Sequence, residues 1–168
     1  MSWIAGTYIQ VVRNTPLLIQ MYIVYFGFSM IGLGLSGFAS GLLALCIQNG
    51  GYMAEIYRGG LQSVSARQYE AGRALGMRHL TLYRIVIVPQ VVARIIPPMT
   101  NQAISITKDT SQVAAIAVMD VMKVAQVWVE SSANTYDVFL GVAIVYVVLT
   151  SAVSLAGKLL EYKLAFAQ

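Results

Sequence analysis

The chain has 168 residues, of which 58% are hydrophobic and 11% are charged, and its mean hydropathy is +0.69. Soluble domains carry about 25% charged residues, so this composition excludes an ordinary water-soluble domain. The net charge of +4 comes from scattered basic residues, which argues against nucleic acid as a partner, and a single cysteine excludes a disulfide framework. We therefore predict an all-α membrane protein with several spans, forming one domain over residues 1–168.

Four apolar stretches are long enough to cross a membrane. A hydrocarbon core of about 30 Å requires roughly 20 helical residues. The predicted spans cover approximately residues 16–35, 38–56, 90–110 and 138–157. The third span is irregular, because Pro89, Pro97 and Pro98 each disfavour helix in the preceding residue. We expect its helix to restart more than once.

The polar section 57–86, between the second and third spans, is predicted to be cytoplasmic. It holds five of the eleven basic residues, and short basic loops stay on the cytoplasmic side of membranes. With four crossings, both termini then lie in the cytoplasm. Ser65 and Gln68 match a capping box, which predicts a short helix over 66–75 that ends at Gly76. Since plain connectors need only about two to eight residues, we interpret the section as a docking element, with a solvated connector as the alternative.

Polar residues inside the second and third spans need partners or a cavity. For Gln48, Asn49 and Gln102, hydrogen bonds between packed helices are the favoured interpretation, and the lining of a substrate path is the alternative.

A charged and hydroxylated sequence, Lys108-Asp109-Thr110-Ser111, interrupts the third span. The ten apolar residues before it rise only about 15 Å, so the break is expected near the membrane centre or in a cavity. Its charges and hydroxyls match the ammonium and carboxylate of an amino acid. Alternatively, these side chains satisfy the end of one helix and cap the next. Residues 111–129 are predicted to form an amphipathic re-entrant or interfacial helix.

The sequence predicts no catalytic site and no bound metal or cofactor. Serines in the spans have no histidine at the same depth to activate them. The single histidine, His79, lies in the cytoplasmic section without other ligands at metal-binding spacing. No Gly-x-x-x-x-Gly-Lys-[Ser/Thr] phosphate-binding loop is present, so any ATPase must be a separate chain.

Four motifs resemble one transporter family. The sequence Glu70-Ala71-Gly72-Arg73-Ala74-Leu75-Gly76, followed by Val86-Ile87-Val88-Pro89, resembles the signature of the membrane subunits of bacterial ABC importers. The segments 13–20, 52–60 and 108–111 are similar to motifs of the polar amino acid permease branch. Together these motifs extend the resemblance over nearly the whole chain.

The chain departs from the family pattern in three respects. Gly72 stands where alanine is usual, which lowers helix propensity by roughly 1 kcal/mol. Valines at 86 and 88 replace isoleucine and leucine. Permeases of this branch usually have five spans, so this chain is expected to begin after the family's first span, through truncation or natural shortening.

The resemblance implies a type I permease subunit of an ATP-driven importer of polar amino acids in the bacterial cytoplasmic (inner) membrane. It implies cytoplasmic ABC ATPase subunits, a second permease subunit in a homodimer or heterodimer, and a periplasmic or lipid-anchored amino acid binding protein as partners. The chain itself would be a transport subunit and not an enzyme. An ion-coupled secondary transporter or channel is the alternative, which should show inverted halves and would not need a capped cytoplasmic helix.

Two sets of candidate site residues result. The residues that the resemblance implies for coupling to the ATPase are Glu70, Ala71, Gly72, Arg73, Leu75, Gly76 and Pro89. The candidates for the substrate path are Gln48, Asn49, Gln102, Lys108, Asp109, Thr110 and Ser111.

Overall fold

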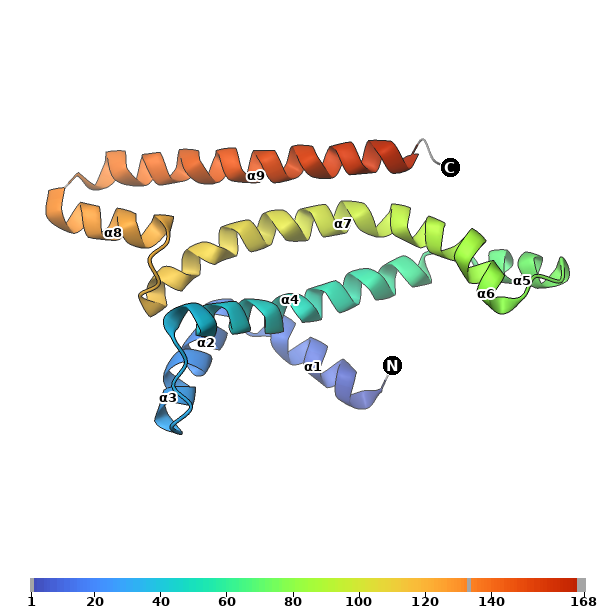
Figure 1. Cartoon of the computed structure of the whole chain (residues 1–168), viewed down its shortest axis with the longest axis horizontal. Helices are drawn as coiled ribbons and strands as arrows, with labels where there is room; N and C mark the ends of the chain where they lie inside the picture. Colours follow the sequence, from blue (N-terminus) through green and yellow to red (C-terminus); the bar gives the residue numbers. More distant parts are fainter. Residues whose placement is uncertain (1, 133, 166–168) are drawn as a thin grey trace.

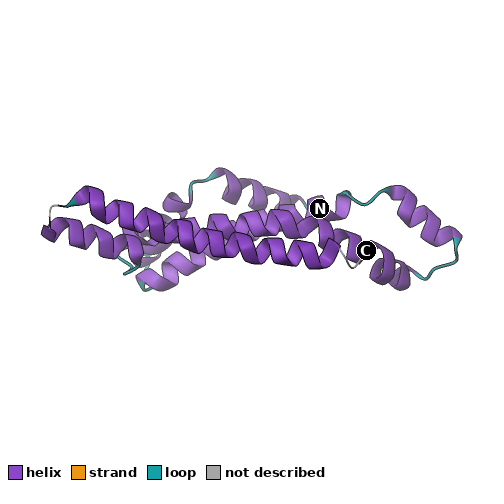
Figure 2. Cartoon of the chain, turned by 90° about the horizontal axis from the view of Figure 1, so that it is seen from above, coloured by secondary structure: helices purple, strands orange, loops and turns teal. Residues whose placement is uncertain are grey.

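The computed structural model describes residues 2–132 and 134–165, and within these ranges every regular element is a helix (Figure 2). The elements are α1 (Trp3–Asn14), α2 (Leu17–Tyr22), η1 (Ile23–Gly27), α3 (Phe28–Met30), α4 (Gly37–Gln62), α5 (Ala66–Ala74), α6 (His79–Leu82), η2 (Tyr83–Ile87), α7 (Val88–Asp109), η3 (Thr110–Ile116), α8 (Val121–Ser132) and α9 (Thr135–Ala165). Elements η1 and η2 are π-helical, and η3 is a 3-10 helix. The predicted all-α fold is confirmed.

Three long helices run along the length of the elongated molecule, with α7 between α4 and α9 (Figure 1). Helices α5 and α6 project at one end, and the end of α8 and the start of α9 lie at the other. Among the described residues, two helical stretches are long and apolar enough to cross a membrane, His79–Ile116 and Thr135–Lys163. Their most apolar 18-residue windows have mean hydropathies of 1.5 and 2.4. In the most apolar part of α9, 0% of the residues are buried, so its apolar side chains remain accessible on the surface of the described chain.

Helix α7 is continuous, so the predicted restarts at its prolines are wrong. Pro89 lies in the first turn of α7, directly after the π-helical turn η2, which leads into α7 without a break. Pro97 and Pro98 lie inside the helix and each removes one backbone donor. The hydroxyl of Thr100 donates to the Ile96 carbonyl at 3.1 Å in the same turn. Helices α4 and α9 also pack along α7, and such neighbours let membrane helices tolerate proline.

Two apolar clusters fix the shorter elements to the long helices. Val64, Leu82, Ile87, Val91 and Ile95 are buried together and join the α5–α6 section to α7. A second cluster of buried residues joins α2 and η1 to α4: Leu17, Met21, Val24 and Ala44. The section 57–86 is therefore a packed extension of the long helices.

The segment 111–129, predicted as one amphipathic helix, consists of two elements. Helix η3 continues α7, and Ala117 then adopts a left-handed conformation with φ of 59°. Asp120 Oδ1 accepts the backbone N–H of Lys123 at 2.8 Å, and this cap explains why α8 begins where it does. Helix α9 contains the predicted span 138–157 and extends beyond it at both ends.

Candidate functional site

A polar cavity of about 480 Å³ lies between the start of α2, the middle of α4 and the end of α7. Four candidate substrate-path residues line it: Gln48, Gln102, Lys108 and Asp109. The remaining lining residues are Pro16, Leu17, Tyr52, Ser105 and Gln112. The other three candidates, Asn49, Thr110 and Ser111, are not among the lining residues.

Helical spacing explains the lining residues that the sequence analysis did not select. Tyr52 follows Gln48 by one turn of α4, and Ser105 follows Gln102 by one turn of α7, so each pair shares a helix face. A search for polar residues three or four positions after each candidate would therefore have identified Tyr52 and Ser105. The same spacing points to Gln112, which follows Lys108 by four residues and Asp109 by three.

The amides beside the cavity form hydrogen bonds between elements. Gln102 Nε2 donates to Asn49 Oδ1 at 2.7 Å, which links α7 to α4. Gln48 Nε2 donates to the Thr15 carbonyl at 3.2 Å, which links α4 to the chain before α2. The amide N–H groups of Gln48 and Gln102 thus form the hydrogen bonds between packed elements that we predicted. The same two residues also line the cavity. Both interpretations hold at these two positions.

The cavity contains one cation and one anion at the end of α7. Lys108 and Asp109 line it, and within the described residues neither takes part in a salt bridge. The neighbouring hydroxyls have a different role, because Thr110 and Ser111 donate to the carbonyls of Thr107 and Lys108 at 2.8 and 2.7 Å. The hydroxyls therefore complete the end of the helix, whereas the two charged residues line the cavity.

An ionic cluster adjoins the cavity on the side of α1. Glu55 makes two contacts to Arg58, at 2.6 and 3.0 Å, and one to Arg13 at 3.4 Å. The hydrogen bonds that Arg58 donates to Glu55 raise the pKa of Arg58 above its ordinary value. The guanidinium of Arg13 also lies 5.3 Å from the ring centre of Tyr52. Together these contacts hold α1 against the wall of the cavity.

The predicted loop helix is present as α5, with its predicted start and a slightly earlier end. The Ser65 hydroxyl accepts the N–H of Arg67 at 3.3 Å, one residue earlier than the predicted capping box requires. Gly76 has φ of +73°, and the N–H of Met77 donates to the Gly72 carbonyl at 3.0 Å. This Schellman arrangement ends the helix at a residue for which the left-handed conformation carries no steric penalty.

Gly72 has a packing role that the sequence did not reveal. A Cβ at this position would overlap the side chain of Leu82, which is only 1% exposed. Glycine therefore lets α6 approach α5 closely, at a cost in helix propensity.

Aromatic contacts hold the two halves of the loop together. The rings of Tyr69 and Tyr83 lie 5.8 Å apart edge to face, and His79 lies 4.6 Å from Tyr83. Burial raises the pKa of Tyr69, and Tyr83 raises it further. Within the described residues, no three histidine, cysteine or acidic side chains are grouped to hold a metal ion.

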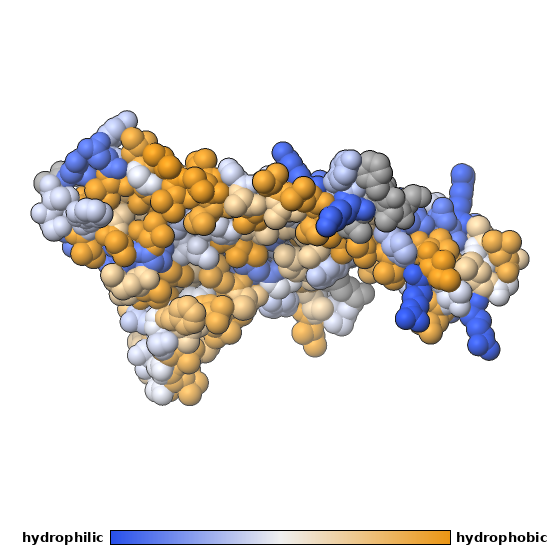
Figure 3. All heavy atoms as spheres, turned by 45° about the horizontal axis from the view of Figure 1, so that its top comes forward, coloured by the Kyte–Doolittle hydropathy of each residue, from blue (hydrophilic) through white to orange (hydrophobic). Residues whose placement is uncertain are grey.

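The outer surface of the loop presents apolar and charged side chains without partners in the described chain. Leu75 is 81% exposed and Leu80 is 74% exposed. Glu70 and Arg73 are also exposed, and within the described residues they form no salt bridge with each other. Figure 3 shows apolar and charged groups together at this end of the molecule. Of the other candidate coupling residues, Ala71, Gly76 and Pro89 are exposed, while Gly72 is buried.

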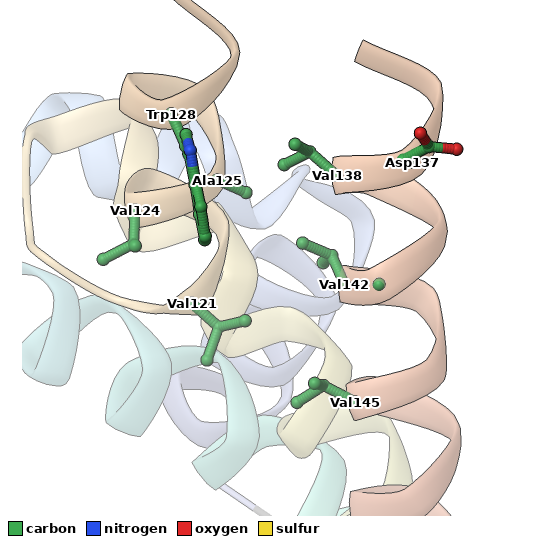
Figure 4. Close-up of a pocket in the computed structure, with 9 residues that line it drawn as sticks. Val121, Val124, Ala125, Trp128, Asp137, Val138, Val142 and Val145 are labelled. Carbon is green, nitrogen blue, oxygen red and sulfur yellow. The ribbon is translucent and has the colours of Figure 1, made fainter. Parts of the chain in front are cut away.

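A second cavity, of about 420 Å³, lies between α8 and α9 (Figure 4). Its wall is formed mainly by valines, with Trp128 and Asp137 also present. No candidate site residue lines it, and apart from Asp137 and the indole of Trp128 its side chains are apolar.

Comparison with known proteins gives consistent matches over nearly the whole chain. Residues 1–165 match the family model described as the binding-protein-dependent transport system inner membrane component. The chain is 36% identical to the probable glutamine ABC transporter permease protein GlnM of Bacillus subtilis, over 98% of this chain and 76% of that protein. It is 34% identical to the octopine transport system permease protein OccM of Rhizobium radiobacter, over 95% of this chain and 69% of that protein.

Two solved structures share the fold. A structure of an amino acid ABC transporter with histidines matches with a TM-score of 0.88 and 34% identity, over 95% of this chain and 75% of that one. The MetNI methionine ABC transporter in an inward-facing conformation matches with a TM-score of 0.76 over 95% of this chain and 73% of that one. At 17% identity, the second match concerns the fold alone.

Proposed function

Because the chain belongs to the family of binding-protein-dependent transport system inner membrane components, we propose that it carries polar amino acids through its α4–α7 cavity and couples to its ATPase through the α5–α6 loop. It is a transport subunit of an amino acid ABC importer, and ATP hydrolysis takes place in separate subunits. Related permeases are named for glutamine, octopine, cystine and arginine. A polar amino acid is accordingly the substrate class that we assign.

The composition of the cavity carries the substrate proposal. A free amino acid has an ammonium group and a carboxylate, and Asp109 and Lys108 supply the complementary charges side by side. The amides of Gln48 and Gln102 add hydrogen-bonding groups that suit a polar side chain. A cavity of about 480 Å³ is within the usual range for small-ligand sites.

The exposed surface of the α5–α6 loop carries the coupling proposal. Leu75 and Leu80 are large apolar side chains at the end of the molecule, and burying them in a groove of a partner would release their contact with water. Glu70 and Arg73 provide charges around them. The apolar cluster beneath the loop joins it to α7, which also lines the cavity, so movement of a docked ATPase would reach the substrate path.

The proposed assembly contains cytoplasmic ABC ATPase subunits, a second permease subunit and an amino acid binding protein outside the membrane. Within the bacterial inner membrane, we place the four spans at approximately residues 16–35, 38–56, 90–110 and 138–157, with section 57–86 and both termini in the cytoplasm. The complex would then alternate between inward- and outward-facing states as the ATPases close.

Reconstitution tests both parts of the proposal. The chain is placed in proteoliposomes with a candidate ABC ATPase and amino acid binding protein from the same organism, and ATP-dependent amino acid uptake is measured. We expect Leu75→Asp to abolish co-purification of the ATPase and uptake, because a charge cannot enter an apolar groove. The matched variant Leu75→Met keeps an apolar side chain and should retain both.

Two results would contradict the proposal. Uptake that continues without any ATPase would favour the ion-coupled carrier or channel. Normal ATPase binding by Leu75→Asp, with the variant inserted in the membrane at the normal level, would mean that the loop surface does not dock.

A further inference from the structure

Two hydrogen bonds in series connect a backbone carbonyl of α4 to an amide in the wall of the polar cavity. Asn49 Nδ2 donates to the Leu45 carbonyl at 2.8 Å, and Asn49 Oδ1 accepts from Gln102 Nε2 at 2.7 Å. A backbone carbonyl can only accept, so the NH2 group of Asn49 must face Leu45 and its oxygen must face Gln102. The Leu45 carbonyl thus fixes the orientation of both amides.

A second backbone carbonyl orients Gln48 in the same way. Gln48 Nε2 donates to the Thr15 carbonyl at 3.2 Å, and this carbonyl also accepts from Gln20 Nε2 at 3.0 Å. Turning the Gln48 amide over would bring its oxygen against the Thr15 oxygen, where two acceptors cannot pair. Gln48 therefore keeps its NH2 group toward Thr15.

The two glutamines leave their carbonyl oxygens free in the wall of the cavity. Both residues line the cavity, and within the described residues no group donates to either Oε1 atom. Neither oxygen is fully buried. Because Gln48 is only 7% exposed, its accessible surface lies in the cavity. The wall therefore offers two acceptors, each with one remaining N–H beside it.

The charges around the cavity supply no partner for a cationic side chain. Asp109 is the only acid among the described lining residues, and the proposed function assigns it to the substrate ammonium. Behind the wall, Arg13 lies 5.3 Å from the ring centre of Tyr52. Glu55 pairs with both Arg13 and Arg58, so one negative charge serves two arginines and adds no attraction for a further cation.

We propose that Gln48 and Gln102 select an amino acid whose side chain ends in a carboxamide, and that Asn49 is the positioning residue that orients Gln102. A carboxamide carries a donor and an acceptor, so it satisfies the free oxygens and the N–H groups beside them. A carboxylate of the same shape has no donor and leaves both oxygens unpaired, which is costly in a cavity. The selection rests on the proposed function, because it requires an amino acid in this cavity.

The orientation of Asn49 prevents the cavity from adapting to a carboxylate. To turn its NH2 group toward the substrate, Gln102 would have to point its oxygen at Asn49 Oδ1. Asn49 could avoid this contact only by pointing its own oxygen at the Leu45 carbonyl. Either arrangement sets two acceptors against each other, so the amides keep the orientation that favours a carboxamide.

Equilibrium binding of amino acids to the assembled permease–ATPase complex, without the binding protein, measures selection by the cavity alone. The probes are glutamine, glutamate, the uncharged γ-methyl ester of glutamate, and arginine. We expect glutamine to bind roughly 10- to 100-fold more tightly than glutamate, because a site built for a donor rejects the analogue that lacks it. The ester should bind as weakly as glutamate, since it also lacks the N–H donors.

Variants of Asn49 test its positioning role. Asn49→Leu removes both hydrogen bonds and frees Gln102 to turn, so the ratio of glutamine affinity to glutamate affinity should fall several-fold. A purely structural defect would weaken both ligands alike and leave the ratio unchanged. The control is Asn101→Leu, at the exposed neighbouring position of α7, which should also leave the ratio unchanged. If Asn49→Leu does not assemble, Gln102→Met provides the same comparison, because it removes the oriented amide itself.

The outcomes distinguish this selection from the proposed function. Glutamate, the ester or arginine binding as tightly as glutamine would overturn the selection, even if ATP-driven uptake is normal. A normal ratio in an assembled Asn49→Leu complex would overturn the role of Asn49. If no amino acid binds and ATP-driven uptake is absent, the proposed function fails, and the selection fails with it.

Discussion

At the scale of single residues, the ends of helices depend on which side chain occupies the left-handed position. Gly76 occupies it at the end of α5, with φ of +73°. We expect Gly76→Ala to destabilise the end of this helix by about 1 kcal/mol, because alanine pays a steric penalty there that exceeds its entropic gain. Hydrogen exchange of the Met77 amide, which donates to the Gly72 carbonyl, should accelerate about fivefold.

A second glycine provides the control for this prediction. Gly59 lies inside α4, and a Cβ there would meet nothing within 4 Å. Gly59→Ala should therefore stabilise its helix by up to about 1 kcal/mol. Equal effects of the two substitutions would contradict the role assigned to Gly76.

Asp109 is the residue on which the charge balance of the cavity depends. Replacing it by asparagine keeps the shape and one acceptor oxygen but removes the charge that would pair with a substrate ammonium. A charge-assisted hydrogen bond contributes about 1.5–3 kcal/mol, so Asp109→Asn should raise the KM for uptake by roughly 10- to 100-fold. The control is Asp137→Asn, at the exposed start of α9, which should leave KM unchanged. If Asp109→Asn also leaves KM unchanged, Asp109 does not bind the substrate ammonium.

At the scale of elements, α9 approaches α7 most tightly where Gly157 meets Thr100. A Cβ at Gly157 would overlap the side chain of Thr100. Gly157→Ala should thus force the two helices apart and cost about 1–3 kcal/mol, the usual range for overpacking. The measurement is thermal unfolding in detergent.

The same helix contains a matched control. Gly141 has nothing within 4 Å of the position of a Cβ, so Gly141→Ala should not lower the unfolding temperature. If both variants lose stability, α9 does not tolerate alanine in general. The loss in Gly157→Ala could then not be assigned to the contact with Thr100.

The elements also show what sequence can and cannot supply. Hydropathy and capping predicted the long helices and the α5 loop, because those signals are local. They failed at Pro97 and Pro98, where packing by α4 and α9 overrides local propensity. They also failed at Gly72, which was interpreted as a weakness of α5 although it makes room for Leu82. The 3-10 conformation of η3 was not predicted either, because no local sequence pattern indicates it.

The cavity illustrates the same division. Gln48, Gln102, Lys108 and Asp109 stand out in the sequence because polar groups are rare inside apolar spans. Asn49, Thr110 and Ser111 carry the same signal but bond to nearby carbonyls, outside the cavity lining. Only the packing of the helices, and not the sequence, determines which of these polar residues line the cavity.

At the scale of the whole molecule, charge predicts orientation. The basic α5–α6 loop and the turn between α8 and α9 lie at opposite ends of the long axis (Figure 1). Because basic loops remain in the cytoplasm, the α8–α9 turn should face the outside of the inner membrane.

Single cysteines at Gln68 and Ser132, both exposed, test this orientation in a Cys46→Ser background. A membrane-impermeant thiol reagent added to spheroplasts should label Ser132→Cys at once and Gln68→Cys only after the membrane is opened. Labelling of Gln68→Cys in sealed cells would invert the orientation and remove the loop from the side on which ATP is available, so the coupling proposal would fail with it.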